Sequence, residues 1–287
     1  MHLLHSRVIH TAAVTLLSTS LVAGFPLQQQ QLSSSILSTL KRPSLVSLAM
    51  STTASNNPMT DLGLPTPLLL GSASFTRKLI LKEMGIDFHK LVRPIDEKEL
   101  GDRSQDAPSD LVMTLGQAKM QHLVQEIQAG RCDNDLPSTH NSDEQTYNFV
   151  VLTGDQVVTC NGQILEKPES IEEARQFVAS YAQHPPSTVG SCVLTHVASG
   201  ISVAGVDTAT IHFADTIPAS LIDELVAKDE PVLSCAGGLM VEHPLTKQYI
   251  TRIDGTEDSV MGLSKDLVLR LLKELADKLA DHKAKSS

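Results

Sequence analysis

The chain has 287 residues, and its 23 Lys and Arg against 33 Asp and Glu give a formal net charge of −10 at pH 7. A nucleic-acid coat or an anionic-membrane binder needs a basic face, and a base-stacking platform needs aromatic side chains, so this acidic chain without Trp is expected to be none of these. The four cysteines form no Cys-x-x-Cys pair and are expected to be reduced, rather than part of a zinc ribbon or a redox dithiol.

Acidic residues are absent from the start of the chain. The first is Asp61, and residues 61–287 hold 33 acidic and 20 basic residues, which gives them a formal charge of −13. Residues 1–60 carry three basic residues and are rich in Ser, Thr, Leu and Gln. We therefore expect 1–60 to be a targeting leader or a disordered tail, and 61–287 to be one domain with a sizeable core.

The leader has two parts that indicate different steps of targeting. An apolar segment over 8–22 ends at Ala23-Gly24, as in a signal peptide, and it is too short and too polar to predict stable membrane insertion. The Ser-rich, acid-free stretch 28–57 is typical of a transit peptide. This order resembles the bipartite leader of proteins imported into plastids. A mitochondrial leader stays an alternative, as does a cytoplasmic product that starts at Met50 or Met59.

The first half of the domain alternates short strands with helices. A buried strand is predicted over 67–71, a helix over 75–84 and a strand-like segment over 88–95. A second helix is predicted over 108–128. The polar stretch 129–148 has no periodicity and is predicted to be a surface loop.

The second half continues the alternation. A strand is predicted over 149–160, the Asn161-Gly162 dipeptide indicates a type I′ turn, and the return strand covers 163–166. The remaining elements are a helix from the capping box at Ser170 to Tyr181, two strands within 191–213, a helix over 218–227 and an amphipathic helix capped by Ser264. This order predicts an α/β or α+β domain.

Hydroxyl and basic side chains follow the first predicted strand. Ser72 and Ser74 lie between this strand and a helix, and Arg77 lies in the first turn of that helix. Helix N-termini attract phosphate, and hydroxyls with an Arg add charge-assisted hydrogen bonds. A phosphate site is one interpretation, and an ordinary Ser N-cap with a solvated Arg is the other.

Lys119 lies on the apolar stripe of the second helix, four residues from both Leu115 and Leu123. A Lys on an inward face either extends to solvent or meets an anion, and both interpretations stay open.

Three carboxylates lie near predicted strand ends. Asp155 follows an apolar run, and pairing outward from the Asn161-Gly162 turn places Lys167 opposite Gln156 and beside Asp155. The Asp96-Glu97 pair ends the strand-like segment, where it either binds Mg²⁺ or forms a solvated turn. Cations, carboxylates and hydroxyls together are what a site needs to bind a polyphosphate and activate a water molecule.

Six segments in order give the chain its resemblance to a known family. They are GSASFTRKLILKEMG, PIDEKEL, LVMTLGQAKM, TGDQVVTCNGQILEKP, SCAGGLMVEHP and DSVMGLS. In this order they resemble the Maf family of nucleoside triphosphate pyrophosphatases. The resemblance implies a two-lobed α/β fold with a mixed sheet flanked by helices and a central cleft. It further implies a homodimer, a nucleoside triphosphate substrate, and hydrolysis to the monophosphate and pyrophosphate with Mg²⁺, Mn²⁺ or a similar divalent ion.

The resemblance also assigns roles to particular residues. It implies that Asp155, Lys167 and Lys119 are catalytic and that Glu97 and Asp155 bind the metal. The phosphate-binding residues that it implies are Ser72, Ser74 and Arg77.

Departures from the family pattern bear on the substrate. Phe75-Thr76 replaces the usual Pro-Arg, Gln156 follows the catalytic Asp, and Glu242 stands where the dTTP/UTP branch commonly has Gln. Gln156 with Glu242 resembles the branch that prefers 7-methyl-GTP, and a carboxylate suits a cationic methylated guanine. A dTTP/UTP pyrophosphatase, a non-catalytic nucleotide-binding regulator and a phosphatase that releases orthophosphate stay alternatives.

Overall fold

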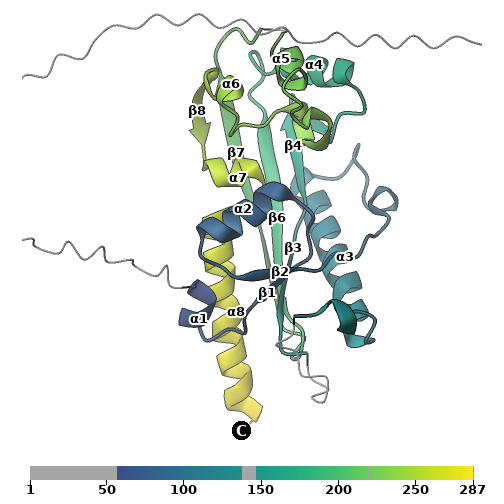
Figure 1. Cartoon of the computed structure of the whole chain (residues 1–287), viewed down its shortest axis with the longest axis vertical. Helices are drawn as coiled ribbons and strands as arrows, with labels where there is room; N and C mark the ends of the chain where they lie inside the picture. The colour runs from purple at the N-terminus through teal and green to yellow at the C-terminus, as the bar shows by residue number, and fades with distance from the viewer. Residues whose placement is uncertain (1–56, 138–146, 219, 287) are drawn as a thin grey trace, which may run out of the picture. The chain divides into compact units, whose positions relative to one another are not determined.

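The computed structural model describes residues 57–137, 147–218 and 220–286, and the leader predicted over 1–60 falls almost wholly outside them. These residues contain one mixed sheet with helices on both faces, as predicted (Figure 1). Its strands are β1 Leu68–Leu70, β2 Phe88–Lys90, β3 Val150–Thr153, β4 Gln156–Cys160, β5 Gln163–Leu165, β6 Ser187–His196, β7 Ser202–Phe213 and β8 Ile250–Asp254.

The helices include every one predicted from the sequence for the described residues. They are α1 Pro58–Asp61, α2 Phe75–Glu83, α3 Pro108–Gln128, α4 Ile171–Ser180, α5 Leu221–Val226, α6 Pro244–Lys247, α7 Glu257–Met261 and α8 Lys265–Ser286. Short 3₁₀ helices cover η1 Glu97–Glu99, η2 Asp133–Asp135, η3 Val232–Ser234 and η4 Ala236–Gly238. No helix in these ranges is both long enough and apolar enough to cross a membrane.

Local signals explain where several of these elements begin and turn. Pro108 opens α3 at its first position, where the missing N–H is not needed. Asn161 and Gly162 both have positive φ angles, as the predicted type I′ turn requires. Ser170 caps α4 by accepting a hydrogen bond from the amide of Glu173, and Ser264 caps α8 in the same way.

The two faces of the sheet are covered differently. Helix α3 lies along one face and packs on strands β1, β3 and β6 through a cluster that includes Leu123 and Val151. The opposite face carries two clusters, one beneath α1, α2 and α8 and the other beneath α4 and α5 (Figure 1). The resemblance implied two lobes, and on this face the core does divide into two halves.

The folded part begins before residue 61, the expected start of the domain. Asn57 caps α1 through its side chain, and Met59 is fully buried in the cluster beneath α1, α2 and α8. The boundary expected at residue 60 therefore moves towards the N-terminus by at least the residues of α1.

The strand predicted over 149–160 is interrupted, which corrects that prediction. It forms β3 and β4, with Gly154 and Asp155 between them, while the single strand β6 pairs with both pieces. A Cβ atom at Gly154 would lie 2.1 Å from the carbonyl oxygen of Ser191, so the chains approach too closely there for a regular ladder. The register is the same on both sides of the break, because Thr153 pairs with Val193 and Gln156 with Gly190.

The break lies in a gap along the edge of the sheet. On its side away from β6, the broken strand pairs with β1 only as far as Leu152 and with β5 only from Val158 onward. Among the described residues, no strand pairs with residues 153–157 on that side. Ligands in α/β proteins commonly bind where strand order leaves such an opening at strand ends. The gap therefore places Asp155 where a ligand can reach it.

Two further differences concern predicted segments of the first half of the domain. The strand-like segment predicted over 88–95 is a strand only over Phe88–Lys90. Within the predicted loop 129–148, residues 138–146 lie outside the described part. The first part of the loop is anchored, because Cys132 is fully buried in the cluster beneath α3 and Asp135 forms an ion pair with Arg93.

Candidate active site

The first turn of α2 is organised by the two predicted hydroxyl residues. Ser74 is the N-cap, and its Oγ accepts a hydrogen bond of 3.3 Å from the amide of Arg77. The amide of Ser74 in turn donates to Ser72 Oγ, also at 3.3 Å. The structure therefore shows Ser74 as the N-cap of α2, while a role of Ser72 and Ser74 in phosphate binding stays a proposal.

Arg77 is buried and holds three segments together. Its Nη1 donates to Ser72 Oγ at 3.2 Å and to the carbonyl of Gly154 at 2.9 Å, and its Nε donates to the carbonyl of Gly262 at 3.0 Å. Burial lowers the pKa of the Arg77 guanidinium from its usual value, and the nearby charge of Asp155 opposes that shift. The alternative of a solvated Arg is therefore wrong.

Lys119 joins two predicted carboxylates. Its Nζ lies 2.6 Å from Asp155 Oδ1 and 3.0 Å from Glu97 Oε2. The side chains of Lys119 and Asp155 are only 17 % and 15 % exposed, whereas that of Glu97 is 46 % exposed. Of the two interpretations of Lys119, the meeting with an anion is confirmed.

Lys167 does not take the position predicted for it. The ladder between β4 and β5 stops at Val158, so Lys167 is not paired with Gln156, and no ion pair between Lys167 and Asp155 is present in the described part of the chain. The reason is that the pairing of β5 with β4 ends before Glu166, because the carbonyl of Glu166 accepts a hydrogen bond from the amide of Gly237 instead. Lys167 is exposed on the surface just beyond that point.

The three expected specificity residues are not gathered into one cluster. The Thr76 hydroxyl lies 2.9 Å from Ser74 Oγ. Gln156 faces the side of the sheet opposite Asp155, because neighbouring strand residues alternate, and its Nε2 donates to the carbonyl of Val260. Glu242 acts on Cys235, whose pKa burial raises to about 11, with the charge of Glu242 adding to the rise.

Lys167 and Glu242 nevertheless share a neighbourhood. Both charges act on the thiol of Cys235, Glu242 raising its pKa and Lys167 lowering it. Both charges are therefore close enough to Cys235 to influence its thiol.

Two residues beside the site, Arg103 and Ser191, were not predicted from the sequence. Arg103 donates to the carbonyls of Glu97 and Leu100 and lies 3.6 Å from the carboxylate of Glu166, so it ties η1 to the end of β5. Ser191 accepts a hydrogen bond from the amide of Asp155. A lone Arg in a loop or a lone Ser in a strand has no local pattern that separates it from others of its type.

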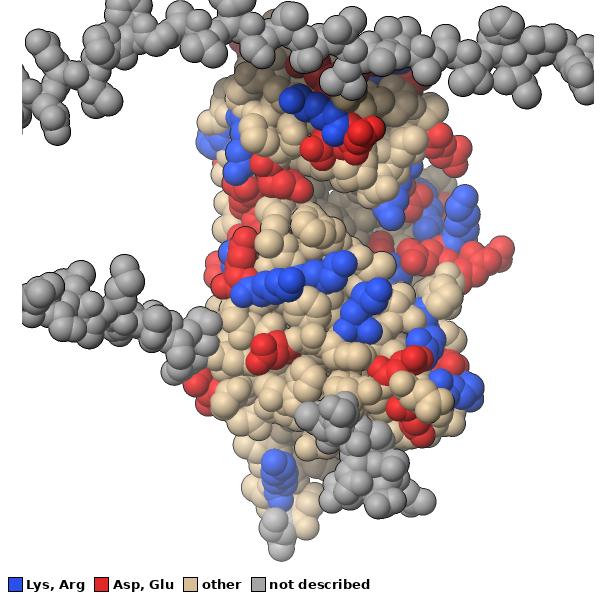
Figure 2. All heavy atoms as spheres, in the orientation of Figure 1, with Lys and Arg blue, Asp and Glu red and all other residues tan. Residues whose placement is uncertain are grey.

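The charged side chains of the site are not part of a large surface patch of one sign. In Figure 2, Lys and Arg alternate with Asp and Glu across the viewed face, without a broad basic patch. No group of three or more His, Cys, Asp or Glu residues that could hold a metal by itself occurs in the described ranges. Glu97 and Asp155 are two such ligands converging on one ammonium group, so a metal bound there would need further oxygen ligands.

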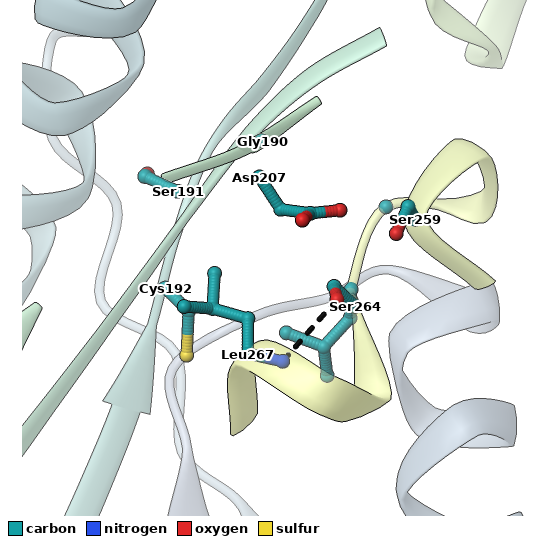
Figure 3. Close-up of a pocket in the computed structure, with 9 residues that line it drawn as sticks. Gly190, Ser191, Cys192, Asp207, Ser259, Ser264 and Leu267 are labelled. Carbon is teal, nitrogen blue, oxygen red and sulfur yellow. Dashed lines mark hydrogen bonds between the residues drawn. The ribbon is translucent and has the colours of Figure 1, made fainter. Parts of the chain in front are cut away.

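A small cavity lies beside this arrangement on the opposite face of the sheet. It is lined by Gly190 and Asp207 on the strands and by Ser259, Gly262 and Ser264 around the turn between α7 and α8 (Figure 3). Neither Asp155 nor Lys119 lines it. The cavity adjoins the turn that Arg77 holds, and one of its lining residues, Ser191, accepts a hydrogen bond from the amide of Asp155.

The fold and the site define an α/β protein whose charged residues gather where one strand of a mixed sheet is interrupted. Over residues 67–275, the chain matches the sequence pattern of the family described as Maf-like protein. The chain therefore belongs to the Maf-like protein family, as the six sequence segments indicated.

Named relatives cover most of the chain. It is 34 % identical over 210 residues to the 7-methyl-GTP pyrophosphatase of Dictyostelium discoideum, covering 73 % of this chain and 98 % of the relative. It is 29 % identical over 222 residues to a nucleoside triphosphate pyrophosphatase of Rhodococcus erythropolis, covering 75 % and 96 %. It is likewise 29 % identical over 217 residues to a dTTP/UTP pyrophosphatase of Salinibacter ruber, covering 76 % and 94 %.

Proposed function

We propose that the chain is a nucleoside triphosphate pyrophosphatase, which cleaves its substrate to the monophosphate and pyrophosphate. The observation that carries this proposal is the contact of Lys119 with both Asp155 and Glu97 at the gap in the sheet edge. It places a base, a cation and a second carboxylate together where a phosphate chain can enter. The names of the relatives from Dictyostelium and Rhodococcus support the same reaction class.

The chemistry follows from these side chains. Asp155 accepts a proton from a water molecule, whose oxygen attacks the α-phosphorus. The bond from that phosphorus to the oxygen bridging the α- and β-phosphates breaks, and pyrophosphate leaves. An ammonium group has three donors; Lys119 hydrogen-bonds Asp155 and forms an ion pair with Glu97, so at least one donor remains for a phosphate oxygen. Its charge opposes the negative charge that builds up in the transition state.

Three phosphate-binding residues have different parts in this proposal. The hydroxyls of Ser72 and Ser74 lie at the start of α2, where they orient phosphate oxygens. Arg77 uses Nε and Nη1 within the protein, which leaves Nη2 to face the phosphates. Lys167, exposed beyond β5, approaches the outer phosphates when substrate binds.

The carboxylates of Glu97 and Asp155 fit a divalent cation such as Mg²⁺ or Mn²⁺. These ions bind carboxylate oxygens and typically complete their coordination with water and substrate phosphates, so two protein ligands suffice. Both carboxylates already approach one cation, the Lys119 ammonium, so their oxygens converge. The bound ion would neutralise phosphate charge.

For the substrate we favour 7-methyl-GTP or a similar modified nucleotide, with dTTP/UTP as the second candidate. Gln156 and Glu242 support this choice through the family pattern, and the Dictyostelium relative bears the matching name. Thr76 and its neighbour Phe75 lie beside the phosphate-binding hydroxyls. The ring of Phe75 is 73 % exposed, against 44 % for Leu233, the next most exposed large hydrophobic residue described. We include Phe75 as a stacking surface for a cationic methylated base.

The test is a screen for metal-dependent pyrophosphate release. Purified protein is offered canonical and methylated nucleoside triphosphates with Mg²⁺, Mn²⁺ or chelator, and both products are identified. Pyrophosphate with 7-methyl-GMP supports the main proposal, whereas turnover confined to dTTP and UTP supports the second candidate. Release of orthophosphate identifies a phosphatase instead. Nucleotide binding without any hydrolysis identifies a regulatory protein.

The leader and the assembly are separate proposals. We propose that the leader expected over 1–60, which ends before α1, directs import into a plastid, with the mitochondrion and a cytoplasmic product from Met50 or Met59 as alternatives. A fluorescent protein fused to residues 1–60 tests this by its destination. From the family resemblance we also propose a homodimer, which light scattering on the eluted protein tests.

A further inference from the structure

We infer that Ser191 is a positioning residue that sets Asp155 against Lys119, an inference that rests on the proposed function for its kinetic consequence. The hydroxyl of Ser191 accepts a hydrogen bond from the amide of Asp155 at 3.0 Å and donates one to the carbonyl of Val112, on α3, at 2.6 Å. One buried hydroxyl therefore connects the break that carries Asp155 with the helix that carries Lys119.

The hydroxyl takes the place of a missing backbone partner. In a regular antiparallel ladder, two facing residues of a hydrogen-bonded pair exchange both N–H···O bonds. Here the amide of Ser191 still donates to the carbonyl of Asp155 at 2.9 Å, but the amide of Asp155 bonds to the Ser191 side chain. The Ser191 carbonyl is instead packed against Gly154, where a Cβ atom would lie only 2.1 Å from its oxygen. The break thus depends on the hydroxyl at position 191.

A second hydroxyl binds α3 one turn after Val112. The hydroxyl of Thr153, which is fully buried, donates to the carbonyl of Gly116 at 2.8 Å. Gly116 lets α3 approach, since a Cβ atom there would lie 2.6 Å from Ser191 Oγ. Val112 and Gly116 are successive contacts on one side of α3, and Lys119 follows three residues later on a neighbouring position of the helix. Both the axial position and the rotation of α3 beside Asp155 are therefore set by these hydroxyls.

The consequence concerns chemistry rather than substrate binding. Neither Ser72 nor Arg77 forms a hydrogen bond with the Ser191 hydroxyl, so we expect its removal to leave the proposed phosphate contacts in place. It releases the Asp155 amide, and the carboxylate then loses its fixed approach to Lys119. A displacement of about 1 Å at a reacting group can cost roughly a hundredfold in rate.

The experiment compares Ser191→Ala and Ser191→Cys, which replaces the hydroxyl by a slightly larger and weaker donor, with Ser187→Ala in the full chain. Ser187 is the matched control, because it lies on the same strand but its hydroxyl contacts Thr210 rather than α3. We expect both Ser191 variants to lower kcat for pyrophosphate release roughly tenfold to a hundredfold with KM within about threefold of wild type. Ser187→Ala should keep the kcat and KM of the wild type.

A second measurement does not depend on turnover. Hydrogen exchange of the Asp155 amide is followed by NMR in all variants. Faster exchange in both Ser191 variants, but not in Ser187→Ala, supports the inference even if no nucleotide is hydrolysed, an outcome that would contradict the proposed function alone. Unchanged exchange in both Ser191 variants would overturn the inference. An equal loss of kcat in Ser187→Ala would also overturn it, because the effect would then be one of general stability.

Discussion

Arg77 Nε donates to the carbonyl of Gly262 across 3.0 Å, which connects the first turn of α2 with the turn before α8. Lys in its place has neither the planar fork nor the Nε donor, so Arg77→Lys should leave buried carbonyls unpaired. We expect a loss of about 1–3 kcal/mol in the free energy of unfolding, measured by urea denaturation. Arg252→Lys, at an exposed ion pair with Asp254, should change it by less than about 0.5 kcal/mol. Equal effects of the two substitutions would contradict the stabilising role of the hydrogen bonds that Arg77 donates.

Asp155→Asn tests the base. An amide keeps the shape of the carboxylate but accepts no proton from water, so pyrophosphate release should fall roughly a hundredfold to ten-thousandfold. Stopped assays for pyrophosphate measure the rate, and the melting temperature of the same samples shows whether the fold is kept. Turnover close to that of the wild type would refute the role of Asp155.

The exposed ring of Phe75 predicts a difference between bases. Stacking is worth about 1–3 kcal/mol per base, so Phe75→Leu should lower kcat/KM for 7-methyl-GTP roughly tenfold to a hundredfold. Phe75→Tyr should retain most of it. Hydrolysis of inorganic tripolyphosphate, which has no base to stack, should not respond to either change. An equal fall on both substrates would point to the helix N-terminus instead.

Met59→Ala tests where the fold begins. Met59 lies in α1 and is fully buried in the cluster shared with α2 and α8, and truncation of such a side chain leaves a cavity that costs about 2–5 kcal/mol. The melting temperature should fall accordingly. If residues up to 60 were all leader, the substitution would have no effect on the melting temperature.

His196 predicts a dependence of stability on pH. Burial lowers the pKa of His196, and the charge of Lys283 lowers it further. The unfolded chain, with an ordinary His pKa of about 6.5, therefore binds this proton at a higher pH than the folded protein. The contribution is complete above about pH 6.5 and is lost as the pH falls through the folded-state value. Melting temperatures between pH 8 and 5 should fall less steeply for His196→Gln than for the wild type.

The elements that sequence predicted well are those set by local signals. Helix α3 begins and ends where expected, because Pro108 fixes its start and an apolar stripe runs along it. Lys119 was placed on the correct face by the same periodicity. That its charge meets both Asp155 and Glu97 depends on segments far apart in the chain, which periodicity does not report.

The errors have tertiary causes. The strand over 149–160 is broken where the carbonyl of Ser191 approaches Gly154. A glycine within a strand can mark a close backbone approach, but the local sequence does not say which segment approaches it. Lys167 was expected beside Asp155 because the hairpin was extended in register. The ladder ends early because the carbonyl of Glu166 pairs with Gly237, some seventy residues later in the chain.

The preserved register across the Gly154–Asp155 break has a consequence for insertions and deletions. Both pieces of the strand share one partner, β6, and side chains alternate between faces with every residue. A single residue inserted at the break would turn Val158 and Cys160 away from the core that they help to fill. The number of residues between Asp155, the candidate base, and this part of the hydrophobic core is therefore fixed. A change in that number would disturb both the base and the core.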